Sequence, residues 1–357
     1  MTRARDTANA LDTFRNRNLI INGAMQVAQR GTSATISSYG SVDRFRFDRT
    51  NTDELAWTQT QQSVTDLAGF SNSYRITTTT AESAIATDEL AYVSQRIEAQ
   101  NLQQLGYGTS SAKNLTLSFY VKSSATGTFA TNIYQVDDNR IINAEYTINS
   151  ANTWERKEIT YAADQTGVID NDNDVGFYVV WNLALGSNYK GNAATAWETY
   201  NTDNWAGSGT YTDAVITTLN ATWEITGVQL ELGDTATPFE HRSFGEELSL
   251  CQRYYEEWGG EDAYQPFGYF EGTGTVGYSV LQFTEKRAAP TVTVSDVAHF
   301  QSTRASVVFS AMTFSQPAPT HVFCTISRSS NNWTSGEIFS WRANASGSAR
   351  IYFNAEL

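Results

Sequence analysis

The chain has few of the residues from which catalytic and metal sites are built. Its 357 residues include two cysteines and three histidines, and the cysteines show no spacing typical of a disulfide framework or a zinc site. We therefore expect Cys251 and Cys324 to be free thiols. No nucleophile-elbow motif accompanies His241, His299 and His321. The sequence thus predicts no catalytic residue, no metal and no cofactor, and we expect a protein that is not an enzyme.

Long apolar runs and positive charge are also scarce. No stretch approaches the roughly 20 apolar residues that cross a bilayer, and the N-terminus lacks the apolar segment of a secretion signal. Lys and Arg number 24 against 38 Asp and Glu, which gives a formal net charge of −14. Because nucleic-acid binding needs a basic face, we expect neither a nucleic-acid partner nor membrane insertion.

The residues that are abundant favour an all-β fold. Thr, Ser, Asn and Gly are frequent, charged residues make up only 17%, and aromatic residues make up 13%. Apolar and polar residues alternate over 115–122, which is typical of a strand with one buried face. Residues 175–185 are apolar on both faces at first, as in a central strand. Many short strands separated by turn residues indicate an antiparallel β-sandwich of the jelly-roll type.

Two distant segments predict the ends of this domain. Asn18–Gly31 and Ile225–Glu240 each read as a strand with turn residues at its end, and we interpret them as the first and last strands. Within the last strand, apolar residues up to Ile225 and from Val228 onward have opposite parity. A β-bulge at Gly227 would keep both halves facing the core.

A short helix and a smaller β-domain are predicted beyond the last strand. Ser243 and Glu246 form a capping-box pattern, apolar residues recur at helical spacing over 246–258, and Gly259-Gly260 supplies a stop. Strand-like runs follow at 290–295, 306–312 and 350–354. The predicted division is an N-terminal arm (1–18), a jelly-roll β-sandwich (19–244), a connector helix (245–260) and a C-terminal β-domain (261–357).

The opening segment and several later motifs together resemble a known family. Asn18–Gly31 reads Asn-Leu-Ile-Ile-Asn-Gly-Ala-Met-Gln-Val-Ala-Gln-Arg-Gly. It is followed in order by Tyr39–Phe45, Val93–Glu98, Lys113–Ser123, Val228–Glu240 and Arg253–Glu256. The ordered set covers residues 18–258 and resembles the jelly-roll module of tailed-bacteriophage tail-fibre and receptor-binding proteins.

The resemblance implies a virion appendage on the surface of the phage particle, with a fold similar to carbohydrate-binding jelly rolls. It also implies a homotrimer whose residues 259–357 form the distal tip, and it suggests the N-terminal arm as the anchor to other virion proteins. Such jelly rolls often hold a structural calcium near their first and last strands. In this chain Gly227 and Gln229 occupy positions where an aspartate would help to bind the ion. The resemblance therefore does not imply a bound calcium here.

A polar, glycine-rich segment, 188–211, is the best candidate for a binding site in the sequence. It contains Trp197, Tyr200, Trp205 and Tyr211. Sugars stack their C–H faces on aromatic rings while polar side chains bond their hydroxyls, so aromatic residues on a loop suit glycan binding. The alternative is that these rings pin a long loop to the sandwich or to a neighbouring subunit.

A second polar segment, Asp170–Asp174, places three carboxylates at alternate positions, as at the start of a calcium-binding loop. The calcium pattern needs Gly at the sixth position and Glu at the twelfth, where this chain has Val175 and Trp181. A solvated turn is therefore the favoured interpretation.

From the sequence we expect a fibre protein of a tailed phage that attaches to glycan on the bacterial surface. Two alternatives stay open. The jelly roll could serve as a structural adaptor that only joins other virion proteins, or the protein could be a tailspike that depolymerises glycan.

Overall fold

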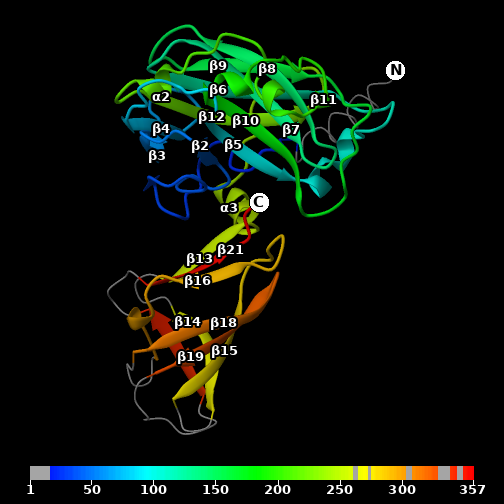
Figure 1. Cartoon of the computed structure of the whole chain (residues 1–357). Helices are drawn as coiled ribbons and strands as arrows, with labels where there is room; N and C mark the ends of the chain where they lie inside the picture. The colour runs from blue at the N-terminus through cyan, green and yellow to red at the C-terminus, as the bar shows by residue number, and fades with distance from the viewer. Residues whose placement is uncertain (1–16, 260–263, 272–274, 303–307, 329–337, 344–348) are drawn as a thin grey trace. The chain divides into compact units, whose positions relative to one another are not determined.

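The structure is a computed structural model that describes residues 17–259, 264–271, 275–302, 308–328, 338–343 and 349–357 (Figure 1). The chain divides into two units, one of Met1–Glu247 with Leu357 and one of Leu248–Glu356. Of the predicted arm, residues 1–16 lie outside the described ranges. No helix within those ranges is long and apolar enough to cross a membrane.

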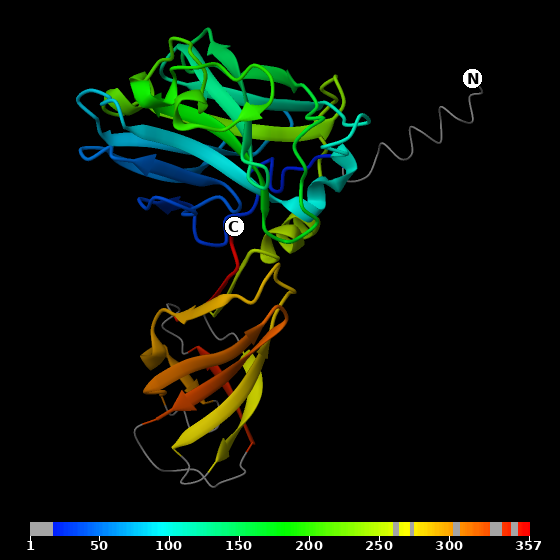
Figure 2. The ribbon, with the colours of Figure 1, turned by 45° about the vertical axis from the view of Figure 1, so that its right-hand side comes forward.

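The first unit is an antiparallel jelly-roll sandwich of two facing sheets, as the alternating sequence pattern predicts (Figures 1 and 2). The first sheet has the order β1 (Ser33–Ala34), β3 (Ala56–Ser63), β4 (Asn72–Thr80), β12 (Thr222–Leu232), β6 (Leu115–Ser123) and β9 (Glu155–Tyr161). The second has the order β11 (Glu198–Thr199), β8 (Arg140–Ile148), β7 (Gly127–Gln135), β10 (Val175–Leu185), β5 (Leu90–Glu98) and β2 (Arg46–Thr50). Short helices lie between strands: η1 (Ala99–Leu105), η2 (Ser187–Tyr189), η3 (Thr202–Asn204) and α2 (Ala214–Thr217).

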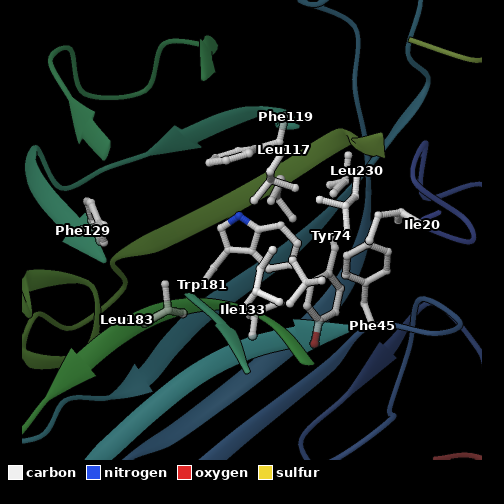
Figure 3. Packing of buried hydrophobic residues seen from close by; sticks show 14 of the residues in the cluster. Ile20, Phe45, Tyr74, Leu117, Phe119, Phe129, Ile133, Trp181, Leu183 and Leu230 are labelled. Atoms are coloured by element: carbon white, nitrogen blue, oxygen red, sulfur yellow. The ribbon is translucent and has the colours of Figure 1, made fainter. Parts of the chain in front are cut away.

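The core of this unit lies between the two sheets. Along β6, the side chains of Leu115, Leu117, Phe119 and Val121 are fully buried, which confirms the predicted alternation. Phe119 of the first sheet meets Trp181 of the second in a T-shaped contact with ring centroids 5.8 Å apart (Figure 3). Because each aromatic side chain buries a large apolar area, this contact between the two sheets stabilises the sandwich.

The predicted bulge in β12 is confirmed. The ladder with β6 pairs Thr226 with Tyr120 but Gln229 with Ser118, so β12 carries an extra residue at this point. Gly227 has a φ of 60°, a left-handed conformation that glycine adopts without strain. The bulge restores the parity of the strand and keeps its apolar residues in the core.

We expect Gly227→Ala to lower the free energy of unfolding by about 2 kcal/mol. Besides the positive φ, a Cβ at this position would lie 2.7 Å from the Phe70 ring and 2.9 Å from the Tyr120 ring. Gly233→Ala is the matched control, because Gly233 has a φ of 111° but no atom within 4 Å of its would-be Cβ. Urea unfolding should show a larger loss for Gly227→Ala, and equal losses would contradict the crowding argument.

The opening segment, residues 18–31, is not the strand that its pattern predicts. Asn22 and Met25 adopt φ angles of 60° and 57°, and left-handed residues interrupt extended backbone. The Asn22-Gly23 pair is a turn signal, and here the turn falls within the apolar run rather than after it. The prediction of a first strand over this range was therefore wrong.

The segment nevertheless completes the first sheet. Since β4 pairs with β12 only over Thr222–Ile225, the rest of β12 lacks that neighbour. There the N–H of Leu19 donates to the Leu230 carbonyl, and the N–H of Val228 donates to the Gly23 carbonyl, both at 2.9 Å. The close approach requires glycine, because a Cβ on Gly23 would lie 2.2 Å from the Val228 carbonyl oxygen.

Side-chain amides hold this segment in the place of a regular ladder. The carboxamide of Asn22 donates to the carbonyls of Val27 and Asp43 and accepts from the N–H of Val27. The Oε1 of Gln95 accepts from the N–H of Ile21 at 2.8 Å, and its Nε2 donates to the Ile21 carbonyl at 2.9 Å. Both amides are buried, so each bond also satisfies a group that water does not reach.

The second unit is the smaller β-domain that the sequence predicts. One sheet has the order β13 (Tyr255–Gly259), β21 (Arg350–Asn354) and β16 (Thr291–Val294). The other has the order β17 (Phe300–Ser302), β20 (Ile338–Ala343), β14 (Tyr264–Glu271), β15 (Val276–Gln282), β19 (His321–Ser327) and β18 (Ala311–Ala318), and η4 (Val297–His299) precedes β17. Of the predicted strand at 306–312, Ala311 and Met312 belong to β18, and residues 306 and 307 lie outside the described ranges.

The predicted helix over 246–258 begins as expected but ends early. It is α3 (Phe244–Gln252), and the Ser243 hydroxyl accepts from the N–H of Glu246 at 3.3 Å, as the capping-box pattern predicts. The later residues form β13 instead, because they pair with β21 along its whole length. That partner lies about a hundred residues further along the chain, so local helical spacing could not reveal it.

Both cysteines are free and buried, as predicted. Burial raises the pKa of the Cys324 thiol to about 12. Since the thiolate is the reactive form of cysteine, this side chain behaves as a packing residue at neutral pH.

Glu155, at the start of β9, makes the stability of the fold depend on pH in the acid range. Burial raises the pKa of its carboxyl, but hydrogen bonds from Lys157, Ser150 and Asn149 outweigh burial and lower the pKa to about 2. Because this value is below the ordinary 4.5, the stabilisation is complete above pH ~4.5 and is lost as the pH falls towards ~2.

Glu155→Gln should therefore reduce the drop in unfolding free energy between pH ~5 and pH ~2.5 by about 1 kcal/mol. Urea titrations at the two pH values measure the drop in the original protein and in the variant. An unchanged drop in the variant would show that Glu155 does not contribute in this way.

Candidate functional site

The four aromatic residues that the sequence singles out do not form one site. The Trp197 side chain is 9% exposed and belongs to the core between the sheets. Its ring stacks on Phe177 at 6.1 Å and meets the Tyr107 ring at 5.6 Å, while its Nε1 donates to the Ala162 carbonyl at 2.6 Å. With both its rings and its one donor engaged, Trp197 pins the loop to the sandwich.

Trp205 packs on the opposite, outer face of the second sheet. Its side chain is 6% exposed, and its Nε1 donates to Oδ1 of Asn182 at 2.8 Å. The ring contacts those of Tyr92, Tyr134 and Tyr200 at centroid distances of 5.6, 6.3 and 5.9 Å. Trp205 is thus the buried base of an aromatic cluster. For both tryptophans, the geometry favours the pinning alternative over direct contact with a sugar.

Tyr211 lines a small hollow further along the loop. Its hydroxyl contacts the Ala206 carbonyl at 2.8 Å and the Glu145 carboxylate at 3.0 Å. Burial, with the Glu145 carboxylate second, raises the pKa of this hydroxyl above its usual range. The hollow, which Asn143 also lines, has a volume of about 240 Å³, below the roughly 300–1,000 Å³ usual for small-molecule sites.

Tyr200, the last of the four, is half-buried and lies at one end of a row of tyrosines. Its ring lies 5.0 Å from that of Tyr134 on β7, and Tyr134 lies 5.6 Å from Tyr178 on β10. Tyr134 and Tyr178 stand directly opposite each other in the strand ladder. Because side chains alternate between the faces of a strand, the buried Phe177 and Val179 place Tyr178 on the outer face. We call Tyr178, Tyr134 and Tyr200 the tyrosine row.

The tyrosine row combines ring surface with available hydrogen-bonding groups. The Tyr134 hydroxyl donates to Oδ1 of Asn139 at 2.9 Å, and burial, then the neighbouring tyrosines, raises its pKa. Over the described ranges, no protein group bonds the hydroxyls of Tyr178 or Tyr200. At one end, the Arg96 guanidinium lies 4.5 Å from the centre of the Tyr178 ring. Such a surface can stack on the C–H face of a sugar and bond its hydroxyls.

The sequence pattern does not single out Tyr134 and Tyr178. Each lies in a strand next to a core residue, and the two-residue period shows that each points away from the core. What the sequence does not show is that β7 and β10 are neighbours, which brings the two rings together and beneath the loop that carries Tyr200.

Asp170–Asp174, whose sequence resembles the start of a calcium-binding loop, forms a bend with exposed aspartates. Its carbonyls serve η1: the N–H of Ala99 donates to Asp174, and the N–H of Gln100 donates to Asp172. Across the described ranges, no group of three His, Cys, Asp or Glu side chains is placed to hold a metal ion. These hydrogen bonds cap the first backbone N–H groups of η1, so the segment has a structural role.

Comparisons with known proteins give distant likenesses only. No family model and no curated protein matches the sequence. Among solved structures, the enzymatically active domain of tailspike protein 4 from bacteriophage CBA120 is similar over 60% of this chain and 21% of that chain, with 15% identity and a TM-score of 0.33. The family 11 carbohydrate-binding module of the Clostridium thermocellum cellulase Lic26A-Cel5E is similar over 57% of this chain and 96% of that chain, with 13% identity and a TM-score of 0.29.

The module TmCBM61, whose structure contains β-1,4-galactotriose, is similar over 61% of this chain and 99% of that chain, with 8% identity and a TM-score of 0.28. The similar region therefore spans about a fifth of the tailspike chain and nearly all of the two modules. At such TM-scores the likeness assigns no ligand and no role to this chain. Its all-β, jelly-roll architecture follows from the order and pairing of its own strands.

Proposed function

We propose that the protein binds glycans along the tyrosine row, on the outer face of the second sheet. The observation that carries the proposal is the row itself, in which three half-buried rings from two strands and a loop lie with centroids 5.0 and 5.6 Å apart. Packing between Trp205 and Tyr200 fixes the loop side of the row, and the ladder fixes the strand side. A preorganised surface of this kind loses little entropy when it binds a sugar.

We further propose that the protein is an appendage of a tailed-phage particle that attaches to bacterial surface glycan. The motifs spread over residues 18–258 support this role through the resemblance they carry. A single row of three rings is a weak site, so attachment would need several copies acting together. The trimer that the resemblance implies would supply them, and the N-terminal arm (1–18) would join the protein to other virion proteins.

Binding to purified bacterial polysaccharides tests the first part of the proposal. The intact protein, Tyr178→Ala and Tyr200→Ala are applied to immobilised capsule and lipopolysaccharide from candidate hosts. We expect each substitution to weaken binding about fivefold, since one ring contact is worth about 1 kcal/mol. Tyr269→Ala is the matched control, because Tyr269 is a 49% exposed tyrosine of the second unit.

The outcomes distinguish glycan attachment from the adaptor and the depolymerising-tailspike alternatives. Equal binding by the intact protein and both row variants would place any glycan site elsewhere, and failure to bind any glycan would favour the adaptor alternative. Release of reducing ends from the polysaccharide would establish the depolymerising tailspike. Light scattering tests the assembly, and a monomer at micromolar concentration would contradict the trimer.

A further inference from the structure

A second concave surface lies on the first unit, on the sheet that does not carry the tyrosine row. It has a volume of about 490 Å³ and is lined by residues 68–70, by Ala236, Pro238, Phe239 and His241, and by residues of β6, β9 and β12. This volume falls within the range of roughly 300–1,000 Å³ found for small-molecule sites. We call it the Phe70 groove.

Aromatic rings form the walls of the Phe70 groove. The half-buried Phe70 ring lies 5.4 Å from Tyr120, 5.1 Å from Phe239 and 5.4 Å from the exposed ring of His241. The bulge at Gly227 makes room for this arrangement, because Phe70 occupies the space that a side chain there would fill. Thus the irregularity that corrects the parity of β12 also shapes the groove.

The side chains that line the groove and can carry a charge near neutral pH are basic. Of the described residues that line it, Arg156 carries a full charge and His241 an imidazole, and none carries a carboxylate. This is notable on a chain with a net charge of −14. Arg156 also pairs with Glu158, with side chains 33% and 50% exposed, and its Nη2 donates to the Thr237 carbonyl at 3.2 Å. Exposed pairs contribute only about 0–1 kcal/mol, so an anionic ligand can compete for the guanidinium.

We propose that the Phe70 groove is a second binding site, and that it takes a sugar residue bearing a carboxylate. The guanidinium of Arg156 matches a carboxylate in shape and charge. The rings of Phe70 and Phe239 offer apolar surface for the C–H face of the sugar, and the Tyr120 and Ser118 hydroxyls can bond its hydroxyl groups. The site lies on a different sheet from the tyrosine row and stands whether or not that row binds glycan.

NMR titration of the intact protein with D-glucuronic acid and with D-glucose tests the proposal, since the two sugars differ by the carboxylate. The chain has three histidines, so the ring protons of His241 can be assigned with a His241→Asn variant and then followed as sugar is added. We expect glucuronate to shift these protons and to bind about tenfold more tightly than glucose, as one charge-assisted hydrogen-bond pair provides.

Arg156→Gln should abolish the preference for glucuronate, and Arg156→Lys should keep part of it. Lys113→Gln, which makes the same change in charge at an exposed lysine outside the groove, should leave the preference intact. Tyr178→Ala should leave it intact as well, which separates this site from the tyrosine row. The proposal is overturned if the His241 protons do not respond, if the two sugars bind equally, or if Arg156→Gln and Lys113→Gln behave alike.

Discussion

Trp197→Ala should lower the free energy of unfolding by about 4 kcal/mol. The substitution removes a buried indole that packs between Phe177 and Tyr107, and it leaves the Ala162 carbonyl without its donor. Loss of buried ring contacts and an unsatisfied carbonyl both act in the same direction. Urea unfolding followed by circular dichroism measures the loss.

Tyr200→Ala is the matched comparison within the same loop. Tyr200 is only half-buried, so its loss should cost about 1 kcal/mol or less while weakening glycan binding. Trp197→Phe, which keeps an aromatic ring but not the indole donor, should fall between the two in stability. If Trp197→Ala unfolded like the original protein yet no longer bound glycan, Trp197 would be a contact residue and not a packing residue.

Asn22→Ala is expected to cost a similar amount, about 4 kcal/mol. The Asn22 side chain is fully buried and makes three hydrogen bonds to backbone groups of Val27 and Asp43. Alanine would leave these groups without partners and would also be strained at a φ of 60°. The effect should appear in the same urea titration as a shifted midpoint with an unchanged slope.

Asn22→Gly separates the two causes. Glycine accepts the positive φ but lacks the carboxamide, so we expect it to lose about 3 kcal/mol, most of the effect of alanine. If Asn22→Gly retained nearly the original stability, the hydrogen bonds of the side chain would not be what holds the opening segment.

Local patterns in the sequence predict much of the fold. The two-residue alternation of β6, the change of parity at Gly227 and the cap at Ser243 each depend on neighbours within a few residues, and the structure confirms all three. Such features are predictable because the periods of strands and helices are short. The all-β class follows from the repetition of these patterns along the chain.

The predictions that were wrong depend on distant partners. Residues 18–31 have a strand-like pattern, but a turn at Asn22-Gly23 interrupts it, and the distant Gln95 side chain bonds the backbone of Ile21 in the place of a ladder. The second half of the predicted helix pairs with β21 instead. In both cases the final backbone conformation also depends on a group far away in the sequence, Gln95 in the first and β21 in the second.

The candidate site shows the same division. The sequence identifies the loop and its aromatic residues, but not which rings turn inward. Trp197 and Trp205 are buried whereas Tyr200 is half-buried. This difference is set by how the loop packs across the second sheet, which the local sequence does not show. Tyr134 and Tyr178 join the site because β7 and β10 are neighbours, and neither the tyrosine row nor the Phe70 groove could be assembled without the order of the strands.

Hydroxyl-radical footprinting with mass spectrometry tests glycan binding along the tyrosine row, since it reports which rings a bound glycan covers. The protein is oxidised with and without a polysaccharide that it binds, and the modification of each tyrosine is compared. We expect bound glycan to protect Tyr134, Tyr178 and Tyr200, while the exposed Tyr269 is oxidised equally in both samples. Binding that leaves the oxidation of the tyrosine row unchanged would contradict this proposal.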